Sequence, residues 1–495
     1  MGNKYVLAID QSTSGTKALV FDGKGNLIAR SDLPHRQIVS ENGWVEHDPL
    51  EIYRNVLGTV KLVVEKSGID KNEIAVVGIS NQRETSMAWD KTTGMPVFNA
   101  IVWQCARGEG ICREIEEQGY AERIKKSTGL KISPYFSAAK LAWILRNVDA
   151  AKTAAKSGNL ICGTMDSWLV YKLTGGKSFK TDYSNASRTQ LFNLNELKWD
   201  DEICSIFGLK ASMLPEVCNS DALFGMTDFE GYLGKAVPIH GVMGDSHGAL
   251  FGQGCHKSGM AKATYGTGSS VMMNIGKKAI FSESGLATSI AWGISGEVEY
   301  VLEGNINYAG AVIKWIESLG LISSPKEAPV LAKGANPNDS TYLVPAFSGL
   351  GAPYWESGAR ASFYGISRST GKAEIVKAAE ECIAYQIADI INAMVKDSGM
   401  EMTSLRVDGG PTRDEYLMQF QSDILGIPLL IPQTEELSGM GAAYAAGIAA
   451  GIYDKESIFA GMQRKEFKPQ MAAAEREKRC NGWKKAVKAV LEVRD

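Results

Sequence analysis

The chain has 495 residues, more than the roughly 250–300 that one hydrophobic core serves, so at least two domains are expected. Hydrophobic residues make up 44% and charged residues 22%, the net charge is −3 and the pI is about 6.1. These values exclude a strongly basic nucleic-acid binder and a protein held on membranes by charge, so a small-molecule partner is expected.

Cysteine usage and the amino terminus bear on the compartment. The eight cysteines are scattered, without the Cys-x-x-Cys spacing that holds zinc. The chain enters a strand-like run at once, without a signal peptide, and no apolar stretch reaches the ~18 residues of a membrane span. A reducing cytoplasm is therefore expected, with no membrane partner.

The first apolar run, residues 5–9, reads as a strand that ends in Asp10, and residues 18–22 read as its hairpin partner. Between them lie the small hydroxyl residues of a loop at 12–16, followed by Lys17. Proteins bind the negative charge of ATP with Mg²⁺ on a carboxylate, with loop N–H groups and with a cation. This segment offers all three, although Asp at a strand end is as common in an ordinary turn.

Further along, residues 73–80 read as a buried strand that is followed by the polar residues 81–85. In α/β sheets, ligands bind at the ends of strands. Residues 138–148 and 166–173 have helical spacing. Residues 236–243 are a second apolar strand, which ends in Gly-Asp at Asp245. A carboxylate delivered there can accept a proton from an acceptor hydroxyl. Two strands that each end in Asp predict a two-lobed phosphotransferase.

The repeated strand pattern also suggests the domain division. One lobe would comprise residues 1–250, with the first phosphate loop and the acceptor-hydroxyl site at Asp245, and the second residues 251–495, with the nucleotide site. In the second lobe, residues 373–398 form a long amphipathic helix. A strand at 405–410 ends in glycines, followed by a helix near Thr412, so that backbone can approach a nucleotide. Catalysis is expected in the cleft between the lobes.

Several longer motifs are spread over nearly the whole chain. They are residues 43–49 (GWVEHDP), 81–85 (NQRET), 100–105 (AIVWQC), 135–144 (YFSAAKLAWI), 181–189 (TDYSNASRT) and 349–355 (GLGAPYW). In this order they resemble the glycerol kinase-like members of the FGGY carbohydrate kinase family. The resemblance implies an α/β fold of two ribonuclease-H-like (actin-like ATPase) lobes, with ATP and Mg²⁺ as cofactors. It also implies a homodimer or homotetramer.

The implied reaction is ATP-dependent phosphorylation of a terminal polyol hydroxyl, with glycerol as the reference acceptor. By matching motif, Asp245 is the general base, and Asp10 with Asp245 holds Mg²⁺. The resemblance assigns the polyol to Arg83, Glu84, Trp103, Tyr135, Asp245, Ser246 and Ser270. It assigns the nucleotide and its phosphates to Thr13, Ser14, Lys17, Thr267, Gly310, Lys314, Gly410 and Asp414.

Two positions depart from the glycerol-site pattern. Ser246 stands where the family usually has Gln, and Ser270 where it usually has Phe. Both changes enlarge the pocket and make it more polar. Two acceptors therefore stay open. One is glycerol, with neighbouring side chains refilling the space, and the other is a four- or five-carbon polyol or ketose whose extra hydroxyls bind His247 or Ser270. A lone His beside an active-site loop is often a structural hydrogen-bonder, and that is the alternative for His247.

Other departures concern regulation and nucleotide contacts. Residues 234–236 lack the Arg that binds a sugar bisphosphate in some relatives, and residues 221–239 contain no phosphorylatable His. Lys314 and Asp414 replace Gln and Asn, which alters the expected base contacts. A non-enzymatic sugar- or nucleotide-responsive sensor is the competing class, because such folds also serve as sensors. The presence of both Asp10 and Asp245 argues against it.

Overall fold

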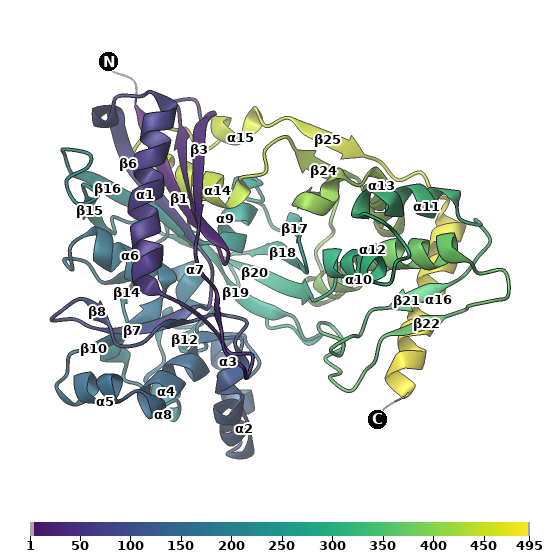
Figure 1. Cartoon of the computed structure of the whole chain (residues 1–495), viewed down its shortest axis with the longest axis horizontal. Helices are drawn as coiled ribbons and strands as arrows, with labels where there is room; N and C mark the ends of the chain where they lie inside the picture. Colours follow the sequence, from purple (N-terminus) through teal and green to yellow (C-terminus); the bar gives the residue numbers. More distant parts are fainter. Residues whose placement is uncertain (1–3, 494–495) are drawn as a thin grey trace.

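The computed structural model describes residues 4–493, which form two α/β lobes side by side. Figure 1 shows the amino-terminal half of the chain in purple to blue-green in one lobe, and most of the carboxyl-terminal half in green and yellow in the other. No helix within residues 4–493 is both long and apolar enough to cross a membrane.

The first lobe is built on a six-stranded sheet. Its order is β15 (Gly225–Thr227), β16 (Val237–Gly244), β6 (Ile74–Asn81), β1 (Tyr5–Gln11), β2 (Gly15–Phe21) and β3 (Leu27–Pro34). β1 pairs with β2 as the predicted antiparallel hairpin, and runs parallel to β6, which runs parallel to β16. The carboxyl ends of β1, β6 and β16 therefore meet at one edge of the sheet, which brings Asp10 and Asp245 to the same edge.

Helices cover both faces of this sheet. One face buries α1 (Pro49–Ser67) and α6 (Met165–Leu173) in a common apolar core. α1 begins where the Asp48 side chain accepts the N–H of Leu50, and it ends at Gly68 in the left-handed conformation, which glycine adopts without steric cost. The other face carries α9 (Asp245–Gly252) and α14 (Leu437–Ala449).

A second sheet completes the first lobe, which the sequence patterns did not predict. Its order is β10 (Leu160–Thr164), β7 (Ser86–Asp90), β9 (Ala100–Ile101), β5 (Val45–His47) and β4 (Ile38–Val39). Around it pack α2 (Glu109–Glu117), α3 (Ala121–Thr128), α4 (Ser137–Asn147) and α5 (Asp149–Lys156). The short helix α7 (Tyr183–Ala186) contacts both β16 of the first sheet and β19 (Ala287–Ile294) of the second lobe.

The second lobe repeats the hairpin-and-parallel-strand pattern in a seven-stranded sheet. Its order is β19 (Ala287–Ile294), β20 (Glu297–Ile306), β18 (Ser269–Gly276), β17 (Ala261–Tyr265), β23 (Leu405–Asp408), β24 (Leu429–Pro432) and β25 (Arg464–Phe467). The predicted amphipathic helix is α12 (Lys372–Ser398). It shares one core with α10 (Gly310–Ser318), α11 (Ala328–Gly334), α13 (Glu415–Leu425) and α16 (Ala473–Glu492).

The helix predicted to start near Thr412 starts later. Residues Gly410–Arg413 form one turn of 3₁₀ helix, and α13 begins at Glu415. The reason is a cap: Asp414 lies in extended backbone, and its carboxylate accepts the N–H groups of Tyr416 and Leu417.

Although α14 lies late in the sequence, it packs on the sheet of the first lobe, beside α9 and β1 (Figure 1). The contact with α9 is close because both helices present glycine: a Cβ on Gly441 would lie 1.9 Å from the carbonyl oxygen of Gly248. A boundary at residue 250 stays a prediction, and the later half of the chain returns to the first lobe at α14.

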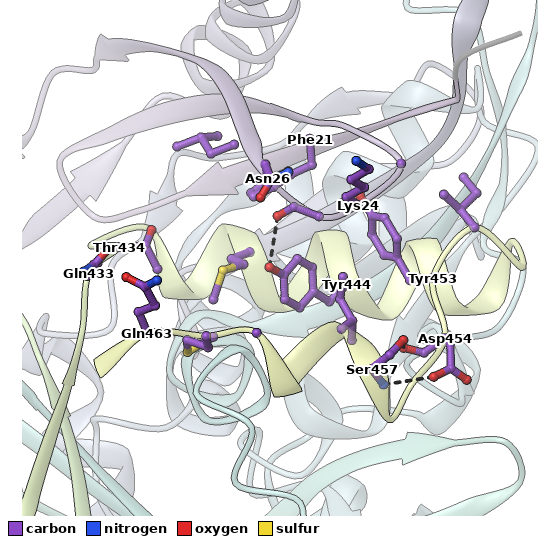
Figure 2. A pocket seen from close by; sticks show the side chains of 18 residues that line it. Phe21, Lys24, Asn26, Gln433, Thr434, Tyr444, Tyr453, Asp454, Ser457 and Gln463 are labelled. Carbon is purple, nitrogen blue, oxygen red and sulfur yellow. Dashed lines mark hydrogen bonds between the residues drawn. The ribbon is translucent and has the colours of Figure 1, made fainter. Parts of the chain in front are cut away.

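The chain crosses between lobes beside a cavity of about 640 Å³. Figure 2 shows this cavity, with Gln433 and Thr434 on the segment that enters α14 and Gln463 on the segment that leaves toward β25. The hydroxyl of Tyr444 donates to the carbonyl of Gly25 at 3.0 Å (Figure 2), and that of Tyr453 donates to the carbonyl of Asp22 at 2.7 Å. These bonds fasten the crossing to the β2–β3 turn.

Candidate active site

A cavity of about 630 Å³ opens between the lobes at the edge where β1, β6 and β16 end. We call it the acceptor cavity. It gathers all seven residues predicted for the polyol site, namely Arg83, Glu84, Trp103, Tyr135, Asp245, Ser246 and Ser270. Thr13 from the first loop and Thr267 from the β17–β18 turn line it as well. Residues scattered over more than 250 positions of sequence thus meet in one place.

Asp245 is the first residue of α9, directly after β16, and its side chain is 34% exposed. One carboxylate oxygen, Oδ1, accepts the N–H of Ser246 at 2.7 Å and lies 3.2 Å from Nε of Arg83. The other oxygen, Oδ2, has no hydrogen bond within residues 4–493. One oxygen is therefore held in place while the other remains able to accept a proton.

Beneath Asp245 lies a buried network of four charged side chains. The guanidinium of Arg83 donates two hydrogen bonds to Glu303, at 2.9 and 2.8 Å. Arg188 donates to Glu84 at 2.6 Å and pairs with Glu303 at 2.9 Å. Although burial alone would raise the pKa of Glu303, Arg188 and Arg83 hold that pKa well below its ordinary range. Glu303 is therefore a fixed anion that orients both guanidinium groups.

The backbone of Glu84 has φ +58°, an uncommon conformation for a residue other than glycine. Such a residue costs on the order of 1–2 kcal/mol and persists where the surroundings enforce it. Here Arg188 holds the Glu84 carboxylate, and the hydroxyls of Ser86 and Ser137 donate to the Glu84 carbonyl at 2.8 and 3.3 Å. The strained turn presents Glu84 to the acceptor cavity.

The aromatic residues Trp103 and Tyr135 form an edge-to-face pair with ring centroids 5.5 Å apart. Nε1 of Trp103 donates to the hydroxyl of Thr13 at 2.9 Å. Burial raises the pKa of Tyr135, so its phenol stays neutral and can both donate and accept. The wall of the acceptor cavity is thus bonded directly to the first phosphate loop.

Lys140 of α4 supports this wall from below. Its ammonium is buried and donates to three consecutive carbonyls, those of Pro134 at 2.8 Å, Tyr135, and Phe136 at 3.0 Å. The backbone of the segment that carries Tyr135 is thereby held in place by one ammonium group. Burial lowers the pKa of Lys140 to about 7, so the ammonium is lost as pH rises above neutrality. A neutral amine has too few N–H groups for three acceptors.

We expect Lys140→Met to raise the KM for the polyol about threefold to tenfold, because three carbonyls, one of them buried, lose their donor. The KM for ATP should stay unchanged, since ATP is expected to bind in a separate cavity, described below. Steady-state kinetics with each substrate varied in turn checks this, and the wild-type KM for the polyol should also rise on the alkaline side. Lys152→Met, at an exposed ion pair of α5, is the matched control. A normal polyol KM in a folded Lys140→Met protein would contradict the role.

A second cavity, of about 760 Å³, lies in the second lobe, and we call it the nucleotide cavity. It is lined by five of the residues predicted to bind the nucleotide, Thr267, Gly310, Lys314, Gly410 and Asp414. It shares Gly266 and Thr267 with the acceptor cavity. A nucleotide in one cavity can therefore direct its terminal phosphate into the other.

Two predicted phosphate residues do not line either cavity. Ser14 is exposed, and the ammonium of Lys17 bonds to Glu436 at 2.8 Å and lies 3.9 Å from Asp10. Asp414 lines the nucleotide cavity, although one of its oxygens is committed to capping α13. His247 is buried against Ser289 at 3.4 Å and does not line the acceptor cavity. A direct hydroxyl contact from His247 has no support in this geometry.

Asp10 offers a site for a cation. Its side chain is buried, and Oδ1 has no hydrogen-bond partner within residues 4–493. Burial raises the pKa of Asp10 to about 6, although Lys17 opposes the shift. No cluster of three or more His, Cys, Asp or Glu side chains exists in the described part of the chain. An unpaired carboxylate oxygen beside a phosphate path fits Mg²⁺, which proteins often hold by one or two carboxylates together with substrate phosphates.

The raised pKa of Asp10 predicts a pH dependence. The carboxylate takes up a proton as pH falls through about 6, and a neutral acid holds a cation poorly. We expect the KM for Mg·ATP to rise below that pH, approaching about tenfold per unit. Kinetics from about pH 5 to about pH 8 checks this. Asp10→Asn should give a high KM that no longer depends on this titration, and a wild-type KM in that variant would contradict the assignment.

Sequence patterns missed four residues of the site, Arg188, Glu303, Asn305 and Asn307. Arg188 is the second-last residue of the motif at 181–189, whose function the pattern alone did not reveal. Glu303 follows Tyr300, Val301 and Leu302 in an apolar strand, and a charge in such a run is a signal that was available.

The whole chain matches known proteins. The N-terminal domain of the FGGY family of carbohydrate kinases matches residues 5–252, and its C-terminal domain matches residues 261–450. "Glycerol kinase 1" of Thermotoga maritima is 50% identical over 490 residues, covering 98% of this chain and 99% of that protein. "Glycerol kinase" of Bacillus velezensis is 46% identical, covering 98% and 99%.

Among solved structures, Plasmodium falciparum glycerol kinase with ADP superposes with a TM-score of 0.93 at 36% identity, covering 99% of this chain and 98% of that one. The predicted fold of two actin-like lobes is confirmed by this match. The predicted family is confirmed as well, and this chain belongs to the FGGY family of carbohydrate kinases.

Proposed function

We propose that this protein transfers the γ-phosphoryl group of ATP to a terminal hydroxyl of glycerol. As a member of its family the chain is an ATP-dependent kinase. The observation that carries the proposal is the meeting of two cavities at Gly266 and Thr267, with Asp245 in the acceptor cavity. The full-length identity of 50% to a glycerol kinase supports glycerol as the acceptor.

In the proposed reaction, Arg83 donates to one glycerol hydroxyl and Glu84 accepts from another, while Trp103 and Tyr135 cover the carbon chain. Asp245 accepts the proton of the terminal hydroxyl as its oxygen bonds to the γ-phosphorus. The bond from the γ-phosphorus to the bridging oxygen breaks, and ADP leaves.

Thr13 and Thr267 line the acceptor cavity. In the proposed reaction their hydroxyls donate to oxygens of the transferred phosphoryl group. We propose that Asp10, with Asp245, holds Mg²⁺, which neutralises phosphate charge when bound. Closure of the lobes around the acceptor excludes water, so that ATP is not hydrolysed without transfer.

The test is whether ADP release requires glycerol. With Mg·ATP and the purified full chain, we expect ADP to appear at a rate that saturates with glycerol and is close to zero without it. A sensor would bind glycerol or nucleotide without turnover. If neither glycerol nor any longer acceptor stimulates ADP release, the kinase function is wrong for this chain.

We also propose a cytoplasmic location and an assembly of two or four copies. The location is supported by the need for ATP and by eight cysteines that are all free thiols. The assembly rests on the family resemblance, and light scattering of the purified protein decides between one, two and four copies.

A further inference from the structure

The acceptor cavity carries more hydrogen-bonding groups than a three-carbon acceptor can use. Three hydroxyls are served by Arg83, Glu84 and Asp245, as described above. The side-chain amides of Asn305 and Asn307 also line the cavity, and neither has a hydrogen-bond partner within residues 4–493. Asn305 is half-buried and Asn307 is exposed, so both amides are open to hydrogen-bonding with a molecule in the cavity.

The strands β18 and β20 place Asn305 beside Ser270. Ser270 is directly opposite Asn305 in the antiparallel pairing, so their side chains share a face of the sheet. Glu303 lies two residues before Asn305 on the same face. The hydroxyl of Ser270 donates to Glu303 at 3.2 Å, which turns it toward the wall of the cavity. A small side chain folded onto the wall leaves open space in front of Asn305.

A second compartment of about 270 Å³ adjoins the acceptor cavity at Asn305. The compartment shares Tyr135, Asn305 and Asn307 with the acceptor cavity. Its far side is formed by Lys131 and Trp355, where the ammonium lies 4.9 Å above the indole ring. The acceptor cavity therefore does not end at the length of glycerol. A longer chain of hydroxymethyl carbons can pass Asn305 and enter the compartment.

We propose that this site also binds and phosphorylates linear polyols of four and five carbons, with their additional hydroxyls held by Asn305 and Asn307. An amide both donates and accepts, as an alcohol does, whereas a ketose carbonyl only accepts. The two amides therefore suit a fully reduced polyol. The inference rests on the proposed kinase function. The terminal hydroxyl loses its proton to Asp245 and gains the γ-phosphoryl group, and ADP leaves, as with glycerol.

The test is a comparison of kcat/KM for glycerol, erythritol, threitol, ribitol, xylitol, xylulose and ribulose in the ADP-release assay. We expect turnover with at least one polyol of four or five carbons at a kcat/KM no lower than that of glycerol. Ser270→Phe should fill the space before Asn305 and lower the ratio of long-polyol to glycerol kcat/KM about tenfold or more. Asn305→Ala should lower the same ratio about tenfold by removing a hydroxyl partner.

A surface amide, Asn195→Ala, is the matched control, and its ratio should equal that of the wild type. Glycerol turnover with no detectable turnover of any longer polyol would overturn this inference and leave the glycerol function intact. Loss of all turnover, glycerol included, would instead contradict the kinase function. Ratios that stay unchanged in both Ser270→Phe and Asn305→Ala would show that Ser270 and Asn305 do not select the acceptor, which also overturns the proposal. Preference for ketoses over polyols would overturn the chemical class.

Discussion

Asp245→Asn is expected to lower kcat about 10²–10⁴-fold, the usual contribution of a positioned general base. The amide keeps the shape of the side chain but cannot accept the proton of the acceptor hydroxyl. Affinity for the nucleotide should change little, because the nucleotide cavity is built from other residues. Single-turnover kinetics with a separate titration of ADP binding distinguishes lost chemistry from lost binding.

The matched control for this experiment is Asp32→Asn. Asp32 is a β3 carboxylate with a 60% exposed side chain, paired at 3.5 Å with Arg30, and it lines neither cavity. It should keep wild-type kcat. If Asp245→Asn also kept wild-type kcat, the assignment of the proton acceptor would be wrong, whatever the acceptor proves to be.

Glu303→Gln is expected to destabilise the protein by about 3–5 kcal/mol, because it leaves two buried guanidinium groups, Arg83 and Arg188, short of an anionic partner. The acceptor affinity should fall as well, since Arg83 loses the carboxylate that orients it. The free energy of unfolding from urea titration and the KM for glycerol measure the two effects.

Two variants sharpen the test of the buried network. Glu297→Gln lies on the same strand, in an exposed pair with Lys277, and should leave stability unchanged. Combining Glu303→Gln with Arg188→Met removes one excess cation and should recover part of the stability without restoring acceptor affinity. Wild-type stability and glycerol KM in Glu303→Gln alone would contradict the role of the network.

The elements with the clearest periodicity were predictable from sequence. The hairpin that ends in Asp10, the strand before Asp245 and the long helix of the second lobe all follow from local apolar patterns. The sheet formed by β10, β7, β9, β5 and β4 was not predictable in this way. Its strands are two to five residues long, and their pairing depends on contacts distant in sequence.

The site shows the same division between local and distant information. Motifs identified the residues of the acceptor wall, and the structure brings all of them to one cavity. Lys17 was assigned to phosphate because of its place after the loop, yet a partner more than 400 residues away, Glu436, binds its ammonium. Lys140 and Glu303 were missed because they act by positioning other residues of the site, and no sequence motif marks such a role.

The most direct measurement of the central claim is identification of the product. After incubation of the full chain with Mg·ATP and glycerol, ³¹P NMR should show one terminal phosphate monoester, glycerol 3-phosphate, for each ADP formed. If Asp245→Asn then forms this ester far more slowly, the transfer to the terminal hydroxyl takes place at the site of Asp245. Inorganic phosphate formed in step with ADP, with glycerol unchanged, would contradict the account.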